Sequence, residues 1–542
     1  MKKSIGFLIM FSLFIVVAFS QQEVEVDHLI RQYYQEDAPG VTVAIVKDGA
    51  TVYKQAVGLA NLSYRIPISD ATVFQLASVS KHFTAYLALL LEQEGKLRME
   101  EDVRTYLPEL EKLPHRITLT QLANHTHGLP NVSELANIKG FGLSDRMWHR
   151  DVVDMALRIE TFNFQPGERY EYNNTGFVLL AEVIERQSGM PFQEALDQYI
   201  FAPLEMKNTL AVASPDQIVP HKIASYAMRN GRYVRFEDNI MSNGSSGVHT
   251  TIDDLARWTK YFQATVNDEN SLFARMLQAS VLNSGTTIPY GLGLETKNYK
   301  GVTAVFHGGG SAGHRAYTLH IPAHNLSVLV LGNGNDYWPL ALAYEIVDLY
   351  LGDLLIADAP VVTHSQNLKS YEGTYAFCPG NYYHFTSQND SLFLEILGNP
   401  GRFYLQPLGN HAFVYPFYPA AKFIFDDQRV DLSIADFIYQ CPAVTTPVLT
   451  TYSTEALAKF TGFYRNEALN TTYEIVAENE QLIARHPINH DIALIGLEGN
   501  SFFSMQGFFA KLDFEEGQEG ECTGFRLSGQ NLKNLLFTRV YP

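Results

Sequence analysis

One apolar stretch, FQLASVSKHFTAYLALLLEQEGK at residues 74–96, carries the features on which the fold of this chain depends. From Phe83 to Leu91 it is apolar on nearly every side, which predicts a helix buried inside the protein. Lys81 stands in the first turn of that helix. A buried ammonium group is unfavourable unless it is paired or gives up its charge, and a cation near a helix N-terminus opposes the helix dipole. Lys81 therefore requires a chemical explanation.

Ser78 lies three residues before Lys81, so on a helix the two side chains share one face. Burial lowers the pKa of a lysine, because desolvation disfavours its charged form. A neutral or proton-sharing amine beside a hydroxyl can activate that hydroxyl as a nucleophile, and a helix N-terminus favours the oxyanion that develops. The alternative is that Ser78 caps the helix and Lys81 points into water.

The length and composition of the chain exclude several classes of protein. With 542 residues the chain is too long for one ordinary core, which predicts more than one domain. A hydrophobic content of 46%, with 12% aromatic residues, is typical of folded globular proteins and excludes a disordered chain. The formal net charge of −18 would repel a nucleic-acid backbone, so no nucleic-acid partner is expected.

Residues 1–20 have the pattern of a cleaved secretory signal peptide. Lys2 and Lys3 precede an apolar run, which ends in small residues before Gln21. An uncleaved membrane anchor is the alternative, but the run of about 14 residues is shorter than the roughly 18 to 20 that a spanning helix needs. We therefore expect an exported protein, periplasmic or secreted, without a stable membrane anchor after cleavage.

Strand patterns at both ends of residues 21–358 enclose a region richer in helix. Residues 41–60 run apolar on both sides of Asp48-Gly49, which predicts a hairpin. The middle includes NNTGFVLLAEVIERQSG at 173–189, a helix pattern that stops at its final glycine. Four strand-like segments follow from 289, and a helix pattern ends near 356. We predict one antiparallel sheet made from both ends, with a helical subdomain inserted. The four segments are PYGLGLE, VTAVF, RAYTLHI and LSVLVLG.

After a connector near 359–364 the pattern is of strands only. LKSYEGTYAF at 368–377 and LAKFTGFYRN at 457–466 align at one constant offset, which indicates an internal repeat. Each copy continues as short alternating segments. We predict two all-β repeats, small lipocalin-like barrels at 365–450 and 455–542.

Three cysteines, Cys378, Cys441 and Cys522, lie in the last third of the chain, and no pair has the spacing of metal ligands. Export permits a disulfide, for which Cys378 and Cys441 are the better pair because they flank one repeat. Three unpaired buried thiols are the alternative. No metal or other cofactor is expected.

Five segments, taken in order, resemble the superfamily of serine β-lactamases and penicillin-binding proteins. The branch resembled contains class C β-lactamases, D-aminopeptidases and related esterases, and the resemblance covers roughly residues 25–355. It implies an α+β domain, with an antiparallel sheet flanked by helices and a helical subdomain, and an acyl-enzyme mechanism that needs no metal. The segments are PGVTVAIVKDGATVYKQAVGLAN, FQLASVSKHFTA, ITLTQLANHTHGLP, PGERYEYNNTGFVLLAEVIE and VFHGGGSAG.

The resemblance assigns roles to residues of the first two motifs. Ser78 would be the nucleophile and Lys81 its partner. The Tyr-x-Asn motif falls on residues 172–174. Tyr172 would act as general base or proton shuttle, because a phenol near a cationic lysine loses its proton more easily. Asn174 would hold Lys81 and the substrate amide. Alternatively, Tyr172 is a packing aromatic and Asn174 a helix cap.

The third motif departs from the β-lactamases, because His307-Gly308-Gly309 stands where they have Lys-Thr-Gly. The resemblance then favours the peptidases and esterases of the branch, and β-lactam hydrolysis is in doubt. His307 would donate a hydrogen bond across the site, and the backbone N–H groups of Ser78 and Gly310 would form the oxyanion hole. Gly308, Gly309 and Arg315 are weaker candidates for substrate contact. Arg315 could pair with a substrate carboxylate or could be a solvated strand end.

Two rival motifs have less support. Residues 309–313 fit the G-x-S-x-G nucleophile elbow around Ser311, but that elbow requires a helix, and HRAYTLHI follows with the alternation of a strand. The same glycines lack the ending of a phosphate loop. His125 and His127 have no third metal ligand nearby in sequence, so a loop packed on the sheet is expected.

We therefore expect an exported serine hydrolase that cleaves amide or ester bonds of small molecules or short peptides, including D-amino-acid peptides, through an acyl-enzyme on Ser78. Its alternatives are a β-lactamase or carboxylesterase of the same fold, and a penicillin-binding sensor that does not turn over. All three motifs are intact, which favours turnover. The barrels could also support an oligomer.

Overall fold

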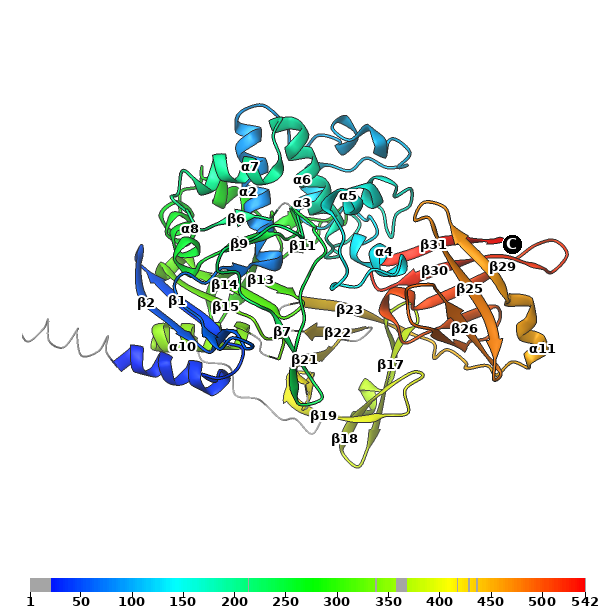
Figure 1. The fold of residues 1–542 in the computed structure, drawn as a ribbon. Helices are drawn as coiled ribbons and strands as arrows, with labels where there is room; N and C mark the ends of the chain where they lie inside the picture. Colours follow the sequence, from blue (N-terminus) through cyan, green and yellow to red (C-terminus); the bar gives the residue numbers. More distant parts are fainter. Residues whose placement is uncertain are drawn as a thin grey trace, which may run out of the picture.

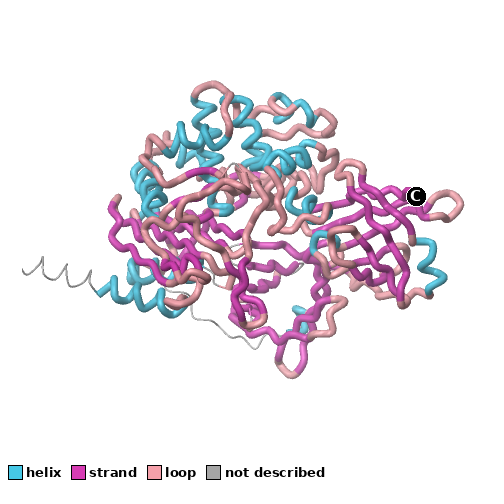
Figure 2. Tube along the Cα trace, viewed as in Figure 1, coloured by secondary structure: helices cyan, strands magenta, loops and turns pink. Residues whose placement is uncertain are grey.

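The structure is a computed structural model that describes residues 21–212, 214–336, 339–356, 368–416, 418–426, 429–434 and 437–541. The predicted signal peptide at 1–20 lies outside the described residues. A mixed domain of helices and strands fills one side of the molecule, and the strands of the C-terminal third form the other side (Figures 1 and 2). No helix of the described part is long and apolar enough to cross a membrane.

The central sheet has six antiparallel strands in the order β12-β13-β14-β15-β1-β2. The N-terminal strand β1 pairs with β15, so both ends of the domain meet in one sheet, as predicted. The apolar alternation of these segments is the cause, since each strand must bury one face or both. The bounds are β1 Val41–Lys47, β2 Ala50–Val57, β12 Glu295–Tyr299, β13 Val302–Ser311, β14 His314–Ile321 and β15 Leu326–Gly332.

The predicted hairpin at Asp48-Gly49 is present between β1 and β2. Both residues have positive φ, 50° and 77°, the conformation that a tight two-residue hairpin turn requires. One face of the sheet packs on α10 (Pro339–Leu351) and on the helical residues 21–33. The other face packs on α8 (Ile252–Thr265) and on the helical subdomain.

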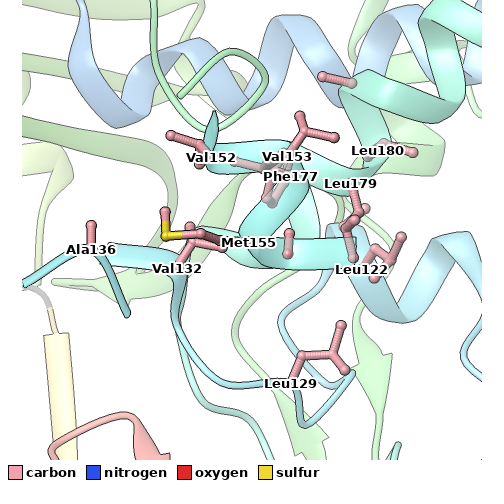
Figure 3. Packing of buried hydrophobic residues seen from close by; sticks show 14 of the residues in the cluster. Leu122, Leu129, Val132, Ala136, Val152, Val153, Met155, Phe177, Leu179 and Leu180 are labelled. Carbon is pink, nitrogen blue, oxygen red and sulfur yellow. The ribbon is translucent and has the colours of Figure 1, made fainter. Parts of the chain in front are cut away.

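The helical subdomain is built around α2, which is buried continuously from Ser80 to Leu89, as its apolar sequence predicted. It packs against α6, and apolar side chains of α3, α4, α5 and α6 lie together in the buried cluster (Figure 3). Helix α6 ends at Gly189, whose φ of 74° closes it as predicted. The bounds are α2 Ser80–Gln93, α3 Leu119–Ala123, α4 Val132–Ile138, α5 His149–Leu157, α6 Thr175–Ser188 and α7 Phe192–Leu196.

The C-terminal region forms two closed eight-stranded barrels, which confirms the predicted all-β fold. The repeated segments begin both barrels in the same way. Gly373 and Gly462 have φ values of 152° and 144°, and each follows a short helical turn. The first barrel contains β16 Gly373–Cys378, β17 Asn381–Gln388, β18 Ser391–Ile396, β19 Arg402–Gly409, β20 Ala412–Tyr415, β21 Tyr418–Phe425, β22 Arg429–Ile434 and β23 Phe437–Val444. The second contains β24 Gly462–Asn466, β25 Thr471–Glu478, β26 Gln481–Arg485, β27 Ile492–Gly496, β28 Ser501–Phe503, β29 Lys511–Glu516, β30 Cys522–Gly529 and β31 Leu532–Val540.

Two expectations need correction. PYGLGLE is a turn, and the strand begins only at its last residue, Glu295. The backbone at Gly293, with φ of 71°, lies so close to α2 that a Cβ would be 2.9 Å from the Lys81 carbonyl oxygen. The cysteines are free and buried, so the Cys378–Cys441 disulfide is not formed and the alternative of three buried thiols holds.

Candidate active site

Ser78 lies in a short 3-10 turn, Ala77–Val79, directly before α2. Ala77 has a positive φ of 46°, which is unfavourable for a residue with a Cβ and typical of constrained functional turns. Both neighbours of Ser78 are buried, whereas Ser78 itself is partly exposed and lines a cavity. The turn therefore presents the serine at the N-terminal end of a buried helix.

Lys81 is completely buried, and its Nζ is surrounded by three oxygen atoms. It lies 3.1 Å from Ser78 Oγ, 2.9 Å from Asn174 Oδ1 and 3.0 Å from the Ser245 carbonyl oxygen. Burial lowers the pKa of Lys81 well below its ordinary value, and the nearby charge of Glu295 opposes that shift. A neutral amine fits this site: its two N–H groups donate to the amide and carbonyl oxygens, and its lone pair faces the Ser78 hydroxyl.

Tyr172 and Asn174 come from the loop that enters α6. The Tyr172 ring lies 4.8 Å from Lys81 Nζ. Burial raises the pKa of Tyr172, although the Ser78 hydroxyl beside it acts in the opposite direction. The expectation that a cationic lysine lowers the pKa of this phenol is thus not met, since burial disfavours both charged groups. Asn174 is the N-cap residue of α6 but makes no side-chain cap; its Nδ2 donates to Ser133 Oγ at 3.1 Å.

His307 is completely buried, and both of its ring nitrogens are engaged within the protein. Nδ1 lies 2.7 Å from the Gly308 carbonyl, which can only accept, so Nδ1 carries the proton. Nε2 then accepts from the Tyr290 hydroxyl at 3.0 Å. Burial lowers the pKa of His307 to about 3, so the ring is neutral. The expected donation from His307 across the site is not what this arrangement provides, because Nε2 accepts from Tyr290, although the His307 and Tyr172 ring centroids lie 6.2 Å apart.

The glycine run at the end of β13 lies against the turn that carries Ser78. A Cβ on Gly309 would be 2.3 Å from the Leu76 carbonyl oxygen and 3.3 Å from Ser78 N, so only glycine fits there. Pairing with β12 ends at Phe306, and beyond it β13 pairs with β14 alone. Gly310 therefore lies on a strand edge that faces the cavity, opposite Ser78. This arrangement suits the predicted oxyanion hole.

The cavity that contains these residues has a volume of about 610 Å³. It lies between the helical subdomain and the edge of the sheet, and Ser78, Tyr172, Asn174 and the three glycines line it. Arg315 also lines it, but its Nη1 donates to the carbonyls of Ala312 and His314, at 3.0 and 2.8 Å. The structure thus brings every predicted site residue to the cavity wall except Lys81 and His307, which are buried and do not line the cavity.

The rival motifs do not build sites. Ser311 is followed by strand β14 rather than by the helix that a nucleophile elbow requires. His125 and His127 are buried, and their Nδ1 atoms accept from the backbone N–H groups of Asn173 and Leu129. Within the described part of the chain, no group of three histidine, cysteine or acidic side chains could hold a metal ion.

Comparison with known proteins decides the family. The profile of the family described as Beta-lactamase matches residues 26–350, which is more than half of the chain. The chain belongs to the beta-lactamase family. A solved structure described as the octameric penicillin-binding protein homologue from Pyrococcus abyssi has a similar fold, with a TM-score of 0.55 and 20% identity. That similarity covers 88% of this beta-lactamase family chain and 99% of the other.

Curated relatives match more than half of this beta-lactamase family chain. The D-aminopeptidase of Gluconobacter oxydans is 29% identical over 297 residues, which are 54% of this chain and 56% of that protein. The D-aminopeptidase of Brucella anthropi is 29% identical over 330 residues, 60% of this chain and 61% of that protein. The match thus spans about three fifths of the length of these relatives.

Several residues at this beta-lactamase family site were missed by sequence reasoning. Tyr290 and Glu295 both lie in PYGLGLE, whose pattern predicts only a strand. Its two glycines were a usable signal, since glycines beside an aromatic residue suggest close backbone packing rather than a strand. Asp238 and Asn531 carried no recognisable motif, because each reaches the site only through tertiary contacts.

The second barrel contributes to this site through the turn between β30 and β31. Asn531 N donates to Glu134 Oε1 at 2.6 Å, and Asn131 N donates to the Asn531 carbonyl at 3.0 Å. Asn531 Nδ2 donates to the Tyr172 carbonyl at 3.4 Å. Asn163 bridges the same turn, donating to the Asn531 carbonyl and accepting from Lys533 N, both at 2.9 Å. The hairpin is therefore fixed to the loop that carries Tyr172.

Proposed function

We propose that this protein is a serine hydrolase that cleaves amide or ester bonds of small acyl substrates, including those of D-amino acids, through an acyl-enzyme on Ser78. The observation that carries the proposal is the placement of Lys81 Nζ, buried and 3.1 Å from Ser78 Oγ, with its N–H groups directed to two other oxygens. A buried amine of lowered pKa, held against a hydroxyl, is a general base.

Acylation begins when Ser78 Oγ attacks the substrate carbonyl carbon and its proton passes to the lone pair of Lys81 Nζ. The oxyanion accepts from the backbone N–H groups of Ser78 and Gly310. The ammonium formed at Lys81 is stabilised by Asn174 Oδ1 and the Ser245 carbonyl. Because Tyr172 keeps its proton in the resting site, it acts as a relay: it gives its proton to the leaving group and receives one from Lys81.

Breaking the scissile bond leaves an ester on Ser78 and releases the amine or alcohol. Water then attacks that ester and gives its proton to Lys81 Nζ, and a proton returns from Lys81 to Ser78 Oγ as the bond between the acyl carbon and Oγ breaks, so the acid is released and Ser78 is regenerated. This two-step route divides one difficult hydrolysis into two easier reactions. A cavity of about 610 Å³ fits a substrate of a few residues, not a folded protein.

The substrate class is supported by the relatives and by the third motif. The two curated relatives are named D-aminopeptidase. His307-Gly308-Gly309 replaces the Lys-Thr-Gly of β-lactamases, so the cavity lacks that lysine ammonium for a lactam carboxylate. We therefore place aminoacyl amides and short-chain esters ahead of β-lactams. Export, as residues 1–20 predict, is part of the proposal and is tested by locating the mature protein in fractionated cells.

A fluorophosphonate probe tests the nucleophile, and D-alanine p-nitroanilide tests turnover. We expect the probe to modify Ser78, identified by peptide mass mapping, and Ser78→Ala to lose both the label and hydrolysis. Ser284→Ala, at an exposed serine in the turn of β10 and β11 (Ser280–Val281 and Thr287–Ile288), should retain both. Label that persists in Ser78→Ala would overturn the proposal. Label at Ser78 without turnover of any amide or ester would instead favour a penicillin-binding sensor.

A further inference from the structure

A buried carboxylate lies in the cavity wall apart from the acylation residues. Asp238 belongs to the segment between β8 (Arg232–Arg235) and β9 (Val248–Thr250), and it lines the same cavity as Ser78. It is only 7% exposed. Aspartate is seldom buried to this degree without a partner that offsets the loss of hydration. Its partners therefore indicate whether it is structural or awaits a ligand.

Neutral donors hold the Asp238 carboxylate in place. Ser311 Oγ donates to Oδ2, and the Ile240 N–H donates to Oδ1 at 3.0 Å. Ser311 also lines the cavity, immediately after Gly310 on β13. These bonds fix the orientation of the carboxylate at the edge of the site, but they bring no positive charge to it.

No cation of the described chain pairs with Asp238. The basic side chain that acts on it is the imidazole of His314, whose Nε2 lies 3.7 Å from a different carboxylate, Glu237 Oε2. The guanidinium of Arg315 donates to backbone carbonyls instead. Burial accordingly raises the pKa of Asp238. A cationic ligand at this position would supply the missing charge and stabilise the ionised carboxylate.

The second acid of the cavity wall has a different environment. Glu295 lines the cavity too, but its charge acts on Lys81, Tyr172 and Tyr290. Asp238 instead lies beside the strand edge one residue beyond Gly310, where the acyl part of a substrate would extend from the oxyanion hole. An α-amino group is two bonds from the carbonyl carbon that Ser78 attacks, and Ser311, which bonds to Asp238, directly follows Gly310 in the same cavity wall.

We propose that Asp238, held by Ser311 and the Ile240 N–H, is a specificity-determining residue that binds a protonated amine on the acyl part of the substrate. The inference rests on the proposed function and refines it: preferred substrates are aminoacyl amides or esters with a free amino group, and acylation of that amine removes the preference. A charge-assisted hydrogen bond in a cavity of this kind is worth about 10- to 100-fold in binding.

Binding is measured without turnover, on the Ser78→Ala protein, by calorimetry with D-alanine amide and N-acetyl-D-alanine amide. We expect the free amine to bind at least about 10-fold more tightly, and Asp238→Asn in the same background to remove that difference. Asp253→Asn, at an exposed aspartate on α8, is the matched control and should keep it. Asparagine retains the shape and one acceptor oxygen for Ser311 but loses the charge and the second acceptor, which bonds the Ile240 N–H.

Two results would overturn the inference: equal binding of the two amides, or a preference that survives Asp238→Asn. With Ser78 present, Asp238→Asn should raise KM for D-alanine p-nitroanilide while leaving kcat within about threefold, the signature of lost uniform binding. If Asp238→Asn lowered kcat equally for D-alanine p-nitroanilide and its N-acetylated form, Asp238 would have a structural role. That result would also overturn the inference. Labelling of Ser78 tests the proposed function separately, so the two can fail independently.

Discussion

Lys81 shows how one residue can be unfavourable for folding and yet be kept for chemistry. Its burial removes the hydration of the ammonium, and the three oxygens around Nζ do not restore it, because its pKa remains well below the ordinary value. The same desolvation that lowers the pKa of Lys81 raises that of Tyr172. Burial thus disfavours the charged forms of both groups, and in the proposed mechanism this favours the amine over the phenolate as the base.

Replacement of Lys81 should separate its roles as donor and base. Lys81→Met removes both and should lower kcat/KM by about 10²- to 10⁴-fold. Lys81→Arg keeps donors for Asn174 and Ser245 but cannot lose its proton, so it should be nearly as inactive. Steady-state hydrolysis of D-alanine p-nitroanilide measures both. Near-normal activity of Lys81→Arg would show that no proton passes to this residue.

The directions of the pKa shifts at Lys81 and Tyr172 predict how activity depends on pH. Because the neutral form of Lys81 is required, kcat/KM should rise as pH rises through its lowered pKa and then stay level. If the phenolate of Tyr172 were the base, activity would instead continue to rise into the alkaline range, since burial raises that pKa. A profile measured with a non-ionising N-acetylated substrate distinguishes the two.

At the scale of elements, the site is a contact between the 3-10 turn before α2 and the end of β13. Glycine is required where the two backbones approach, as the short distance from a Cβ on Gly309 to the Leu76 carbonyl shows. Gly308 faces the other way, where a Cβ would lie 3.6 Å from the Tyr317 ring, an ordinary contact. The fit of turn against strand sets the distance between Ser78 N and Gly310 N.

Substituting alanine for Gly309 and for Gly308 tests how closely the 3-10 turn must pack against β13. Gly309→Ala should push the turn from the strand, misplace the oxyanion donors and lower kcat by about 100-fold or more. Gly308→Ala is the matched substitution one residue away and should lower kcat by less than about tenfold, because its methyl group has room. Hydrolysis rates of the two variants give the comparison. Similar rates would mean that the close approach does not position the oxyanion hole.

At the scale of the whole molecule, the second barrel is docked on the catalytic domain through a buried acid. Burial raises the pKa of Glu134 to about 8, although the Asn531 N–H bonds to its Oε1. Among the described atoms its Oε2 has no hydrogen-bond partner, and it lies against Gly529. The protonated form thus suits the interface better than the carboxylate.

Stability should therefore depend on pH through Glu134. The folded state keeps a proton that the unfolded chain releases, so the contribution is fully present below pH 4.5 and is lost as pH rises through about 8. Glu134→Gln cannot ionise and should flatten this dependence, a difference on the order of a few kcal/mol at alkaline pH. Urea unfolding of both proteins across this range measures it. Parallel curves for the two proteins would contradict the assignment.

Docking of the barrel should also affect the chemistry, because the hairpin touches the loop that carries Tyr172. Asn163→Ala removes side-chain bonds to Asn531, Lys533 and Glu171, and should lower kcat by roughly tenfold while increasing amide exchange at 529–533. Asn531→Ala keeps the backbone bonds and should have a smaller effect. Unchanged exchange in Asn163→Ala would show that the apolar contacts alone hold the hairpin.

The sequence alone predicted most of the elements and the residues that the structure brings together at the cavity. Local patterns carried this information: the apolar run of α2, the turn at Asp48-Gly49, the helix stop at Gly189 and the repeated start of each barrel. Ser78 and Lys81 are three residues apart, so local helical geometry brings their side chains together without help from the rest of the chain.

Only the tertiary structure decided what surrounds those residues. Burial by segments distant in sequence sets the direction of the pKa shifts at Lys81 and Tyr172, and the hydrogen bond from Tyr290 occupies His307 Nε2. Asp238 and Asn531 lie in segments without a motif, and long-range packing brings Asp238 to the cavity and Asn531 to the loop that carries Tyr172. Desolvation and hydrogen-bond geometry are properties of the assembled core, so a pattern of neighbours along the chain cannot contain them.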